Sequence, residues 1–259
     1  MIKPVLHYFN LTDEVVAFST TRHGGVSKGR LATLNINPHR GDEPSAVAEN
    51  LQAVATEIGV QADKVIRLHQ IHETHCLTVT DVFFHLSAAE QYEMEEGKDA
   101  VVTDCRNVCI GVHTADCVPV LFYDPVHHAI GAAHAGWRGT VQRIAQHTLR
   151  KMTELYGTDP KELKAVVGPC ISQKNFEVGQ EVYDAFSAAG FPMERIARMY
   201  EKWHIDLPLC NQLQLEELGV PAANILQSGI CTYDNASDFF SARILKEGFG
   251  TIYTGIALK

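Results

Sequence analysis

Residues 108–140 read VCIGVHTADCVPVLFYDPVHHAIGAAHAGWRGT. The stretch holds three short apolar runs, rich in valine and isoleucine and separated by turn residues, which is typical of neighbouring buried β-strands. These runs cover residues 108–113, 118–123 and 129–134. Cys117 directly precedes the second run, and His134 ends the third. The stretch therefore predicts a sheet that presents possible metal ligands at the ends of its strands.

The same patterns continue on both sides of this stretch. Apolar runs predict further strands at 15–20, 64–72, 75–82, 100–104, 164–167 and 251–258. Helical spacing of apolar residues predicts helices at 140–156, 180–189 and 207–218, the last capped by Asp206, and another from Pro44 to a stop at Gly59. The acidic segment 83–97 lacks a clear pattern, and we interpret it as a solvated loop rather than a lid.

The order of these elements predicts the fold class. The strands cluster in the chain, the helices lie outside the cluster, and no linker, repeat or low-complexity stretch interrupts the order. We therefore expect one α+β domain over residues 1–259, built as a layered sandwich rather than a doubly wound parallel sheet.

Composition narrows the function classes. Of 259 residues, 46% are hydrophobic and 20% charged, and the net charge is −9, which disfavours nucleic acid as a partner but allows a small anionic substrate. No signal peptide and no apolar run of about 18 residues is visible, so we expect no membrane span. Seven cysteines without a dense spacing pattern favour reduced thiols in the cytoplasm.

Two histidines and a cysteine form the candidate metal site. His72, Cys117 and His134 suit zinc, and a fourth position left to water would make the site catalytic. Alternatives remain open at this point. His69 and His75 share the spacing of His72, and on a strand they would face the opposite side. His113 is a rival ligand four residues before Cys117. Taken alone, Cys117 is better interpreted as a buried, inert cysteine, and the neighbouring Asp116 shifts the balance towards a functional site.

Three charged residues beside these segments are candidates for catalysis and substrate binding. Asp116 lies next to Cys117 at a strand junction, and burying a carboxylate there costs free energy unless the group has a function. Arg138 precedes a predicted helix whose amides favour anions, and the plain alternative is that it only packs on Trp137 or pairs with an acid. Arg22 lies in a glycine-rich turn and is the second candidate for binding an anion, with a solvated loop residue as the plain alternative.

Several motifs occur together and in order: TRHGGVS (21–27), QIH (70–72), DAVVT (99–103), TADCVP (114–119), HAGWRGT (134–140), GPCI (168–171) and FFS (239–241). On these motifs the chain resembles the YfiH-like family, also called the laccase-domain or polyphenol-oxidase family, over nearly its whole length. One departure is His113, where the family more often has an apolar residue.

The resemblance implies a single-domain α-β-β-α sandwich with zinc held by His72, Cys117 and His134. It also implies phosphorolysis of adenosine, inosine, guanosine and methylthioadenosine, and deamination of adenosine. Zinc lowers the pKa of bound water, which supplies the nucleophile for deamination, and Asp116 is the candidate proton shuttle. Arg22 and Arg138 are the candidates for holding phosphate.

Two alternative functions stay open. A copper-dependent polyphenol oxidase follows from the family's older label, but the chain has no His-x-His pair of the kind that multicopper sites use. A metal-free cysteine hydrolase would pair Cys117 with His134 as thiolate and imidazole. Purine nucleosides and phosphate are the expected partners, and the sequence does not reveal the oligomeric state.

Overall fold

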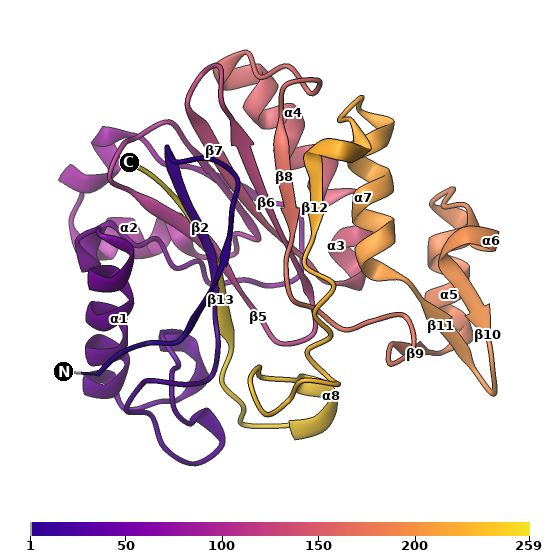
Figure 1. Ribbon diagram of the computed structural model, residues 1–259, viewed down its shortest axis with the longest axis horizontal. Helices are drawn as coiled ribbons and strands as arrows, with labels where there is room; N and C mark the ends of the chain where they lie inside the picture. The colour runs from indigo at the N-terminus through magenta and orange to yellow at the C-terminus, as the bar shows by residue number, and fades with distance from the viewer. Residues whose placement is uncertain (1) are drawn as a thin grey trace.

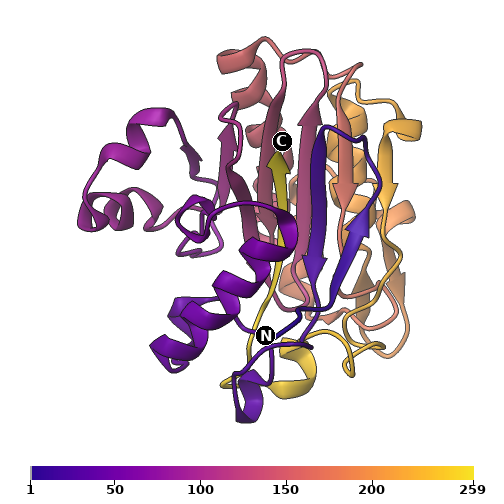
Figure 2. The same cartoon turned by 60° about the vertical axis from the view of Figure 1, so that its left-hand side comes forward.

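A computed structural model describes residues 2–259, and its central layers are two β-sheets that face each other (Figures 1 and 2). The larger sheet has the order β12-β8-β6-β7-β4-β3. Its strands are β3 (Cys76–Thr78), β4 (Ala100–Thr103), β6 (Val118–Asp124), β7 (Ala129–Ala135), β8 (Lys164–Val167) and β12 (Ile225–Gln227). The smaller sheet has the order β1-β2-β13-β5. Its strands are β1 (Leu6–Phe9), β2 (Val15–Thr20), β5 (Cys109–Thr114) and β13 (Ile252–Leu258).

Side chains that point alternately to the two faces of a strand explain why the sheets stack. In β6, Val120 and Phe122 point to the outer face of the larger sheet, whereas Leu121 and Tyr123 point inward, and all four are fully buried. A strand of antiparallel sheet normally leaves one face to water. Here both faces are apolar, so each sheet must be covered on its inner and its outer side, and a layered fold follows.

Helices cover the two outer faces. The outer face of the smaller sheet packs against α1 (Pro44–Ile58), through residues such as Val54 and Ala55. The outer face of the larger sheet packs against α4 (Ile144–Tyr156) and α7 (Leu207–Glu217). The expected α-β-β-α layering is thereby confirmed.

The remaining elements surround these layers. They are α2 (Ala88–Glu95), α3 (Trp137–Val141), α5 (Gln180–Ala188), α6 (Met193–Ile196), α8 (Ala242–Leu245) and a small sheet of β9 (Glu177–Val178), β10 (Ala197–Met199) and β11 (Trp203–Ile205). Short 3-10 helices occur at Gly29–Leu31, Pro38–Arg40, Ala62–Lys64, Asp81–His85 and Ala222–Asn224. Among the residues described, no helix is both long and apolar enough to cross a membrane.

Most predicted elements are confirmed, including β2, β8, the stop of α1 at Gly59 and the Asp206 cap of α7. The strand expected at 64–72 is wrong. Its apolar side chains are buried, but its backbone joins other strands only through isolated bridges at Val65 and His69. The strand expected at 75–82 is limited to β3.

Two helix predictions also need correction. The helix expected over 140–156 is broken, because Arg143 has a left-handed backbone (φ 65°) between α3 and α4. The Arg143 guanidinium binds Glu217 and the carbonyl of Ala189, and these tertiary contacts override the local helical pattern. The segment 83–97 is not a loop, since it contains α2, which begins with a capping box formed by Ser87 and Glu90.

Candidate metal centre

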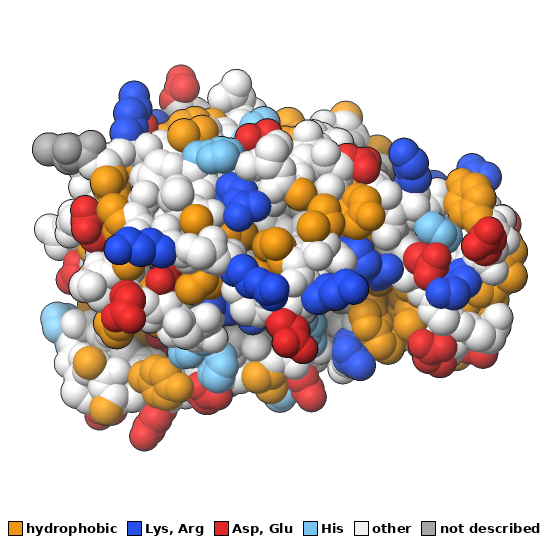
Figure 3. All heavy atoms as spheres, turned by 90° about the horizontal axis from the view of Figure 1, so that it is seen from below, with side chains coloured by type: hydrophobic (Ala, Val, Ile, Leu, Met, Phe, Trp, Pro, Cys, Tyr) orange, Lys and Arg blue, Asp and Glu red, His pale blue; other side chains and the backbone are white. Residues whose placement is uncertain are grey.

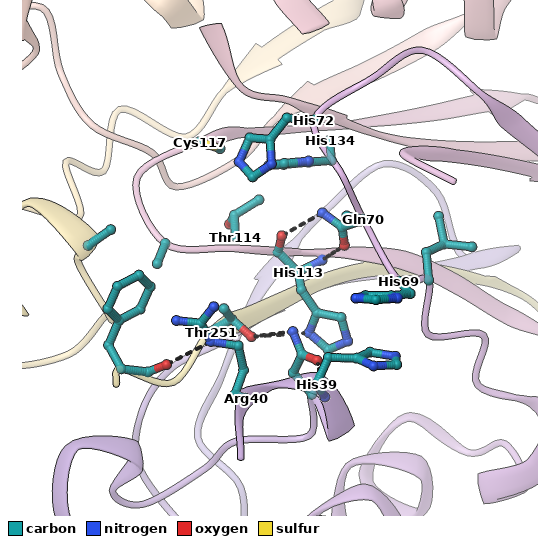
Figure 4. Close-up of a pocket in the computed structure, with 15 residues that line it drawn as sticks. His39, Arg40, His69, Gln70, His72, His113, Thr114, Cys117, His134 and Thr251 are labelled. Carbon is teal, nitrogen blue, oxygen red and sulfur yellow. Dashed lines mark hydrogen bonds between the residues drawn. The ribbon is translucent and has the colours of Figure 1, made fainter. Parts of the chain in front are cut away.

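A cavity of about 260 Å³ lies where the ends of the central strands meet the loops of the N-terminal third. Its volume is at the small end of the range for ligand pockets. His72, Cys117 and His134 line one end, and His39, Arg40 and His113 line the other, with Thr114 between them (Figure 4). The two ends are built differently.

The structure brings the three candidate metal ligands together from three separate segments. One ligand atom from each of His72, Cys117 and His134 lies within 4.8 Å of the other two. The two imidazole rings meet edge to face with centroids 4.7 Å apart. Among residues 2–259, this is the one group of three or more potential ligands of this kind. His113, the rival ligand in the sequence, is not part of it.

Asp99 positions two of these ligands, although nothing in the sequence singled it out beyond its place in a motif. Its carboxylate is fully buried and accepts a hydrogen bond from His134 Nδ1 at 2.7 Å. The same carboxylate accepts the backbone N–H groups of Ile71, His72 and Glu73 at 2.9–3.1 Å. Because Nδ1 of His134 is engaged, Nε2 is left for a metal, which is the usual carboxylate–histidine arrangement at metal sites.

The hydrogen bonds to Asp99 also explain the conformation of His72. This residue lies in a turn with φ at 68°, not on the predicted strand, so the face argument from the sequence does not apply. A non-glycine residue in the left-handed region is strained and needs support from its surroundings. Three successive N–H groups bound to one carboxylate provide that support and aim the imidazole at Cys117.

Gly136 supplies the space in which the ligands meet. A Cβ atom at this position would lie 3.0 Å from His72 Cδ2, 3.2 Å from Cys117 Sγ and 3.8 Å from His134 Nε2. All three side chains therefore converge over the bare Cα of one glycine. Its φ of −63° is ordinary, so the need for glycine here is one of space and not of backbone conformation.

The protonation states of the cluster favour metal binding. Burial alone would raise the pKa of the Cys117 thiol, but the neighbouring His134 and His72 outweigh it and lower this pKa to about 6. Burial would lower the pKa of His134, but the Cys117 thiolate and Asp99 raise it to about 9. Without a metal, the pair is thus a thiolate beside an imidazolium, and a bound cation would replace the proton on Nε2.

The donor set fits zinc. Tetrahedral bonds of ordinary length place neighbouring ligand atoms about 3.4–3.6 Å apart, so side chains already within 4.8 Å need only a small movement. His134 is buried, Cys117 is half-buried and His72 is exposed, so the group is open to the cavity on one side. Three N and S ligands with an open side match a catalytic rather than a structural zinc site.

Asp116 does not line the cavity. Its carboxylate accepts hydrogen bonds from Thr232 Oγ1 at 2.6 Å, Ser241 Oγ at 3.0 Å and the backbone N–H of Arg243 at 2.7 Å. These contacts join the turn that carries Cys117 to the C-terminal segment. The structure thus gives Asp116 a positioning role, and none of its contacts supports the proton transfer expected from the sequence.

The two arginines selected for phosphate also lie outside the cavity lining. Arg22 donates to the carbonyls of Ala32 and Ala236 and lies over the Phe240 ring. Arg138 is exposed and stacks on Trp137 at 4.5 Å, which is the plain alternative that the sequence left open. A basic residue that the sequence analysis did not consider, Arg40, faces the cavity instead.

The comparisons with known proteins agree with this geometry. Residues 16–259 match the family described as multi-copper polyphenol oxidoreductase laccase. A purine nucleoside phosphorylase of Bacteroides thetaiotaomicron is 41% identical, with 99% of this chain and 97% of the relative covered. The adenosine deaminase RL5 of an unknown prokaryotic organism is 37% identical, with 98% of both chains covered.

Solved structures show the same fold. The hypothetical protein YfiH of Bacillus licheniformis superposes with a TM-score of 0.91 at 31% identity, covering 99% of this chain and 97% of that one. YlmD of Geobacillus stearothermophilus superposes with a TM-score of 0.88 at 30% identity, covering 95% and 93%. Fold, motifs and relatives agree, and this chain belongs to the YfiH-like, laccase-domain family of enzymes.

Proposed function

We propose that this protein is a zinc-dependent purine nucleoside phosphorylase that acts on adenosine, inosine, guanosine and methylthioadenosine and also deaminates adenosine. The observation that carries the proposal is the convergence of His72, Cys117 and His134 at one end of a cavity. Relatives named for both activities, at 41% and 37% identity over nearly the whole chain, supply the substrate class.

The chain's own residues prepare the site for this chemistry. Zinc, when bound, acts as a Lewis acid and activates water at neutral pH. Asp99 fixes the tautomer of His134, and Gly136 leaves room for the three ligands to share one ion.

Product analysis tests the proposal directly. The protein is stripped of metal, reloaded with zinc and incubated with adenosine, with and without phosphate, and the products are separated by chromatography. Adenine and ribose 1-phosphate are expected only with phosphate, and inosine is expected in both samples. Full phosphorolysis by metal-free protein contradicts the zinc role, and the absence of both reactions contradicts the assignment of function.

Copper oxidation of phenols is the second candidate, because the family description names it. The described residues gather one group of three ligands, which holds one ion and not a multicopper cluster. Metal analysis of protein purified without added metal separates the two candidates, since a stoichiometric copper content would favour the oxidase.

The thiolate–imidazolium pair is what a metal-free cysteine hydrolase would use. A thiolate that binds zinc is a poor nucleophile, so the two roles exclude each other. Rapid alkylation of Cys117 in the presence of zinc would favour the hydrolase.

For the location of the protein in the cell we propose the cytoplasm. All seven cysteines are free thiols in the structure, which supports a reducing compartment.

A further inference from the structure

A residue that lines the end of the cavity remote from the metal centre has a buried polar atom without a partner. His113 lies at the end of β5 and is 4% exposed, and its ring forms part of the cavity wall. Its Nε2 makes no hydrogen bond within the described residues, even though the atom is fully buried. An unpaired polar atom in such a place is costly, so its presence requires a reason.

A chain of hydrogen bonds is compatible with a proton on Nε2 of His113. The backbone N–H of His39 donates to Asn37 Oδ1 at 2.9 Å, so Nδ2 of Asn37 is the atom that donates to Thr251 Oγ1 at 3.3 Å. Thr251 can then give its own hydroxyl proton to His113 Nδ1, 3.3 Å away. A neutral imidazole that accepts at Nδ1 carries its proton on Nε2. In this arrangement the unpaired atom is a donor.

Two arginines are close to this ring. Burial lowers the pKa of His113 well below its usual value, and the charges of Arg67 and Arg40 lower it further, so the ring is neutral beside two cations. Arg40 uses Nε to bind the carbonyl of Phe249 at 3.0 Å and lies over the Phe249 ring. Within residues 2–259 its two terminal amines have no hydrogen-bond partner, and the side chain lines the cavity.

These groups lie together in the close-up, where His113, Arg40, Thr251 and His39 surround the lower end of the cavity and His72 and His134 occupy the upper end (Figure 4). On the face of the molecule seen from below, Lys and Arg side chains form a row among acidic ones, although the chain has a net charge of −9 (Figure 3).

We propose that His113 Nε2 and the terminal amines of Arg40 form an oxyanion site that binds inorganic phosphate for attack on a nucleoside held between this site and the metal. The inference rests on the proposed function and says where its second substrate, inorganic phosphate, binds. In that reaction a phosphate oxygen bonds to C1′ of the ribose as the bond from C1′ to the purine nitrogen breaks. The electron pair leaves with the purine, which takes up the hydrogen of monohydrogen phosphate.

Calorimetric titration of the zinc-loaded protein with inorganic phosphate tests the site without relying on turnover. His113→Leu removes the donor and Arg40→Met removes the charge while keeping an apolar stem over Phe249. Each should weaken phosphate binding and raise the KM for phosphate roughly 10- to 100-fold, the effect of losing one hydrogen bond to a charged group. Arg198→Met is the matched control, because it removes one exposed arginine on β10, and phosphate binding should not change.

A second set of variants tests the hydrogen-bond chain and does not depend on how well His113→Leu folds. Thr251→Val removes the hydroxyl that sets the proton on Nε2, and it should weaken phosphate binding several-fold, whereas Thr251→Ser should restore it. His113→Gln places an amide N–H near the position of Nε2, and it should recover part of the loss seen with His113→Leu. A role of His113 in packing alone predicts no such rescue.

The possible outcomes distinguish an error in the oxyanion site from an error in the proposed function. If the wild-type protein phosphorolyses adenosine and all these variants keep the wild-type affinity and KM for phosphate, the oxyanion site is wrong and the function stands. If the wild-type protein binds phosphate in a way that depends on His113 and Arg40 but phosphorolyses no nucleoside, the site stands and the function is wrong. Binding of adenosine 5′-monophosphate through these residues without binding of free phosphate contradicts the co-substrate role.

Discussion

The two ends of the cavity are held in place by different means. At the metal end, one buried carboxylate, Asp99, accepts four hydrogen bonds between 2.7 and 3.1 Å, three of them from successive backbone N–H groups. At the oxyanion end, His113 and Asn37 reach Thr251 through contacts of 3.3 Å. Arg40 is held by one hydrogen bond of 3.0 Å from its Nε to the Phe249 carbonyl and by a stack on the Phe249 ring at 4.3 Å.

The difference matches what each ligand requires. A metal ion accepts ligands only within narrow limits of distance and angle, so its side chains need support from the backbone. An oxyanion has several acceptor oxygens and tolerates donors from several directions, so flexible cationic side chains suffice. Variants at the metal end should therefore change zinc content first, and variants at the oxyanion end should change phosphate affinity first.

The largest effect is expected for Cys117→Ser. A serine hydroxyl is a poor zinc ligand compared with a thiolate whose pKa is already lowered, so stoichiometric zinc binding should be lost and both activities should fall to background. Zinc content by mass spectrometry of metals and product analysis measure the two effects. Retention of stoichiometric zinc by this variant would remove Cys117 from the metal centre.

The second largest effect on zinc binding is expected for Asp99→Asn. The amide removes the negative charge behind His134 and presents an N–H₂ group to backbone N–H donors, so we expect a 10- to 100-fold loss of zinc affinity. Unfolding free energy should also fall by about 1–3 kcal/mol, as buried donors lose their acceptor. Competition with a chelator and urea unfolding measure the two quantities.

Asp124→Asn is the matched control for that variant. Asp124 is equally buried and accepts two backbone N–H groups and a histidine Nδ1, all within its own turn at the end of β6. Its replacement should lower stability by a similar amount and leave zinc affinity unchanged. Equal losses of zinc affinity in both variants would mean that Asp99 acts through general stability and not through His134.

Gly136→Ala tests the space between the ligands. The added methyl would lie 3.0 Å from the His72 ring and 3.2 Å from the Cys117 sulfur, so the ligands must move apart, and zinc affinity should fall several-fold. Gly139→Ala, three residues later, meets its neighbours at ordinary distances of 3.4–3.5 Å and lies inside α3. This control should keep its zinc and gain up to about 1 kcal/mol of stability from helix propensity. Unchanged zinc affinity in Gly136→Ala would show that the ligands do not meet over this glycine.

The contrast between the two ends of the cavity also explains which parts of the site could be predicted from the sequence. The apolar runs around Cys117 and His134 predict strands, and strand ends meet at one edge of a sheet, so the gathering of possible ligands there was foreseeable. The resemblance to a known family supplied His72 as the third member. The layered sandwich was predictable because the strands cluster in the chain with the helices outside the cluster, and the resemblance supplied the α-β-β-α order.

The positioning residues were not predictable, because their roles depend on contacts between distant segments. Asp99 and His134 are 35 positions apart, and His113 and Thr251 are 138 apart. Arg138 was chosen for its place before a helix, but α3 has only five residues and the side chain turns to Trp137. Helix α2 was different, since its capping signal, Ser87 with Glu90, was present in the sequence and was overlooked.

The smallest effect is expected beside the oxyanion end, where Glu95 on α2 lines a neighbouring hollow together with His39 and Arg67. Burial raises the pKa of Glu95 to about 7, although the charge of Arg67 lowers it. The folded protein therefore favours the protonated carboxyl. Its contribution to stability is fully present below the ordinary pKa of 4.5 and is lost as the pH rises through about 7.

Glu95→Gln should remove this pH dependence, because a neutral amide replaces the protonated carboxyl at every pH. At about pH 8 the variant should exceed the wild type by about 1 kcal/mol in unfolding free energy, a value reduced by partial solvent exposure, and at about pH 4 the two should agree. Urea unfolding at both pH values measures the difference, with the exposed neighbour Glu93→Gln as the control. Equal slopes with pH for all three proteins would show that folding does not raise the pKa of Glu95, so this carboxylate would be ionised at neutral pH and would partly neutralise the cations at this end before any anion binds.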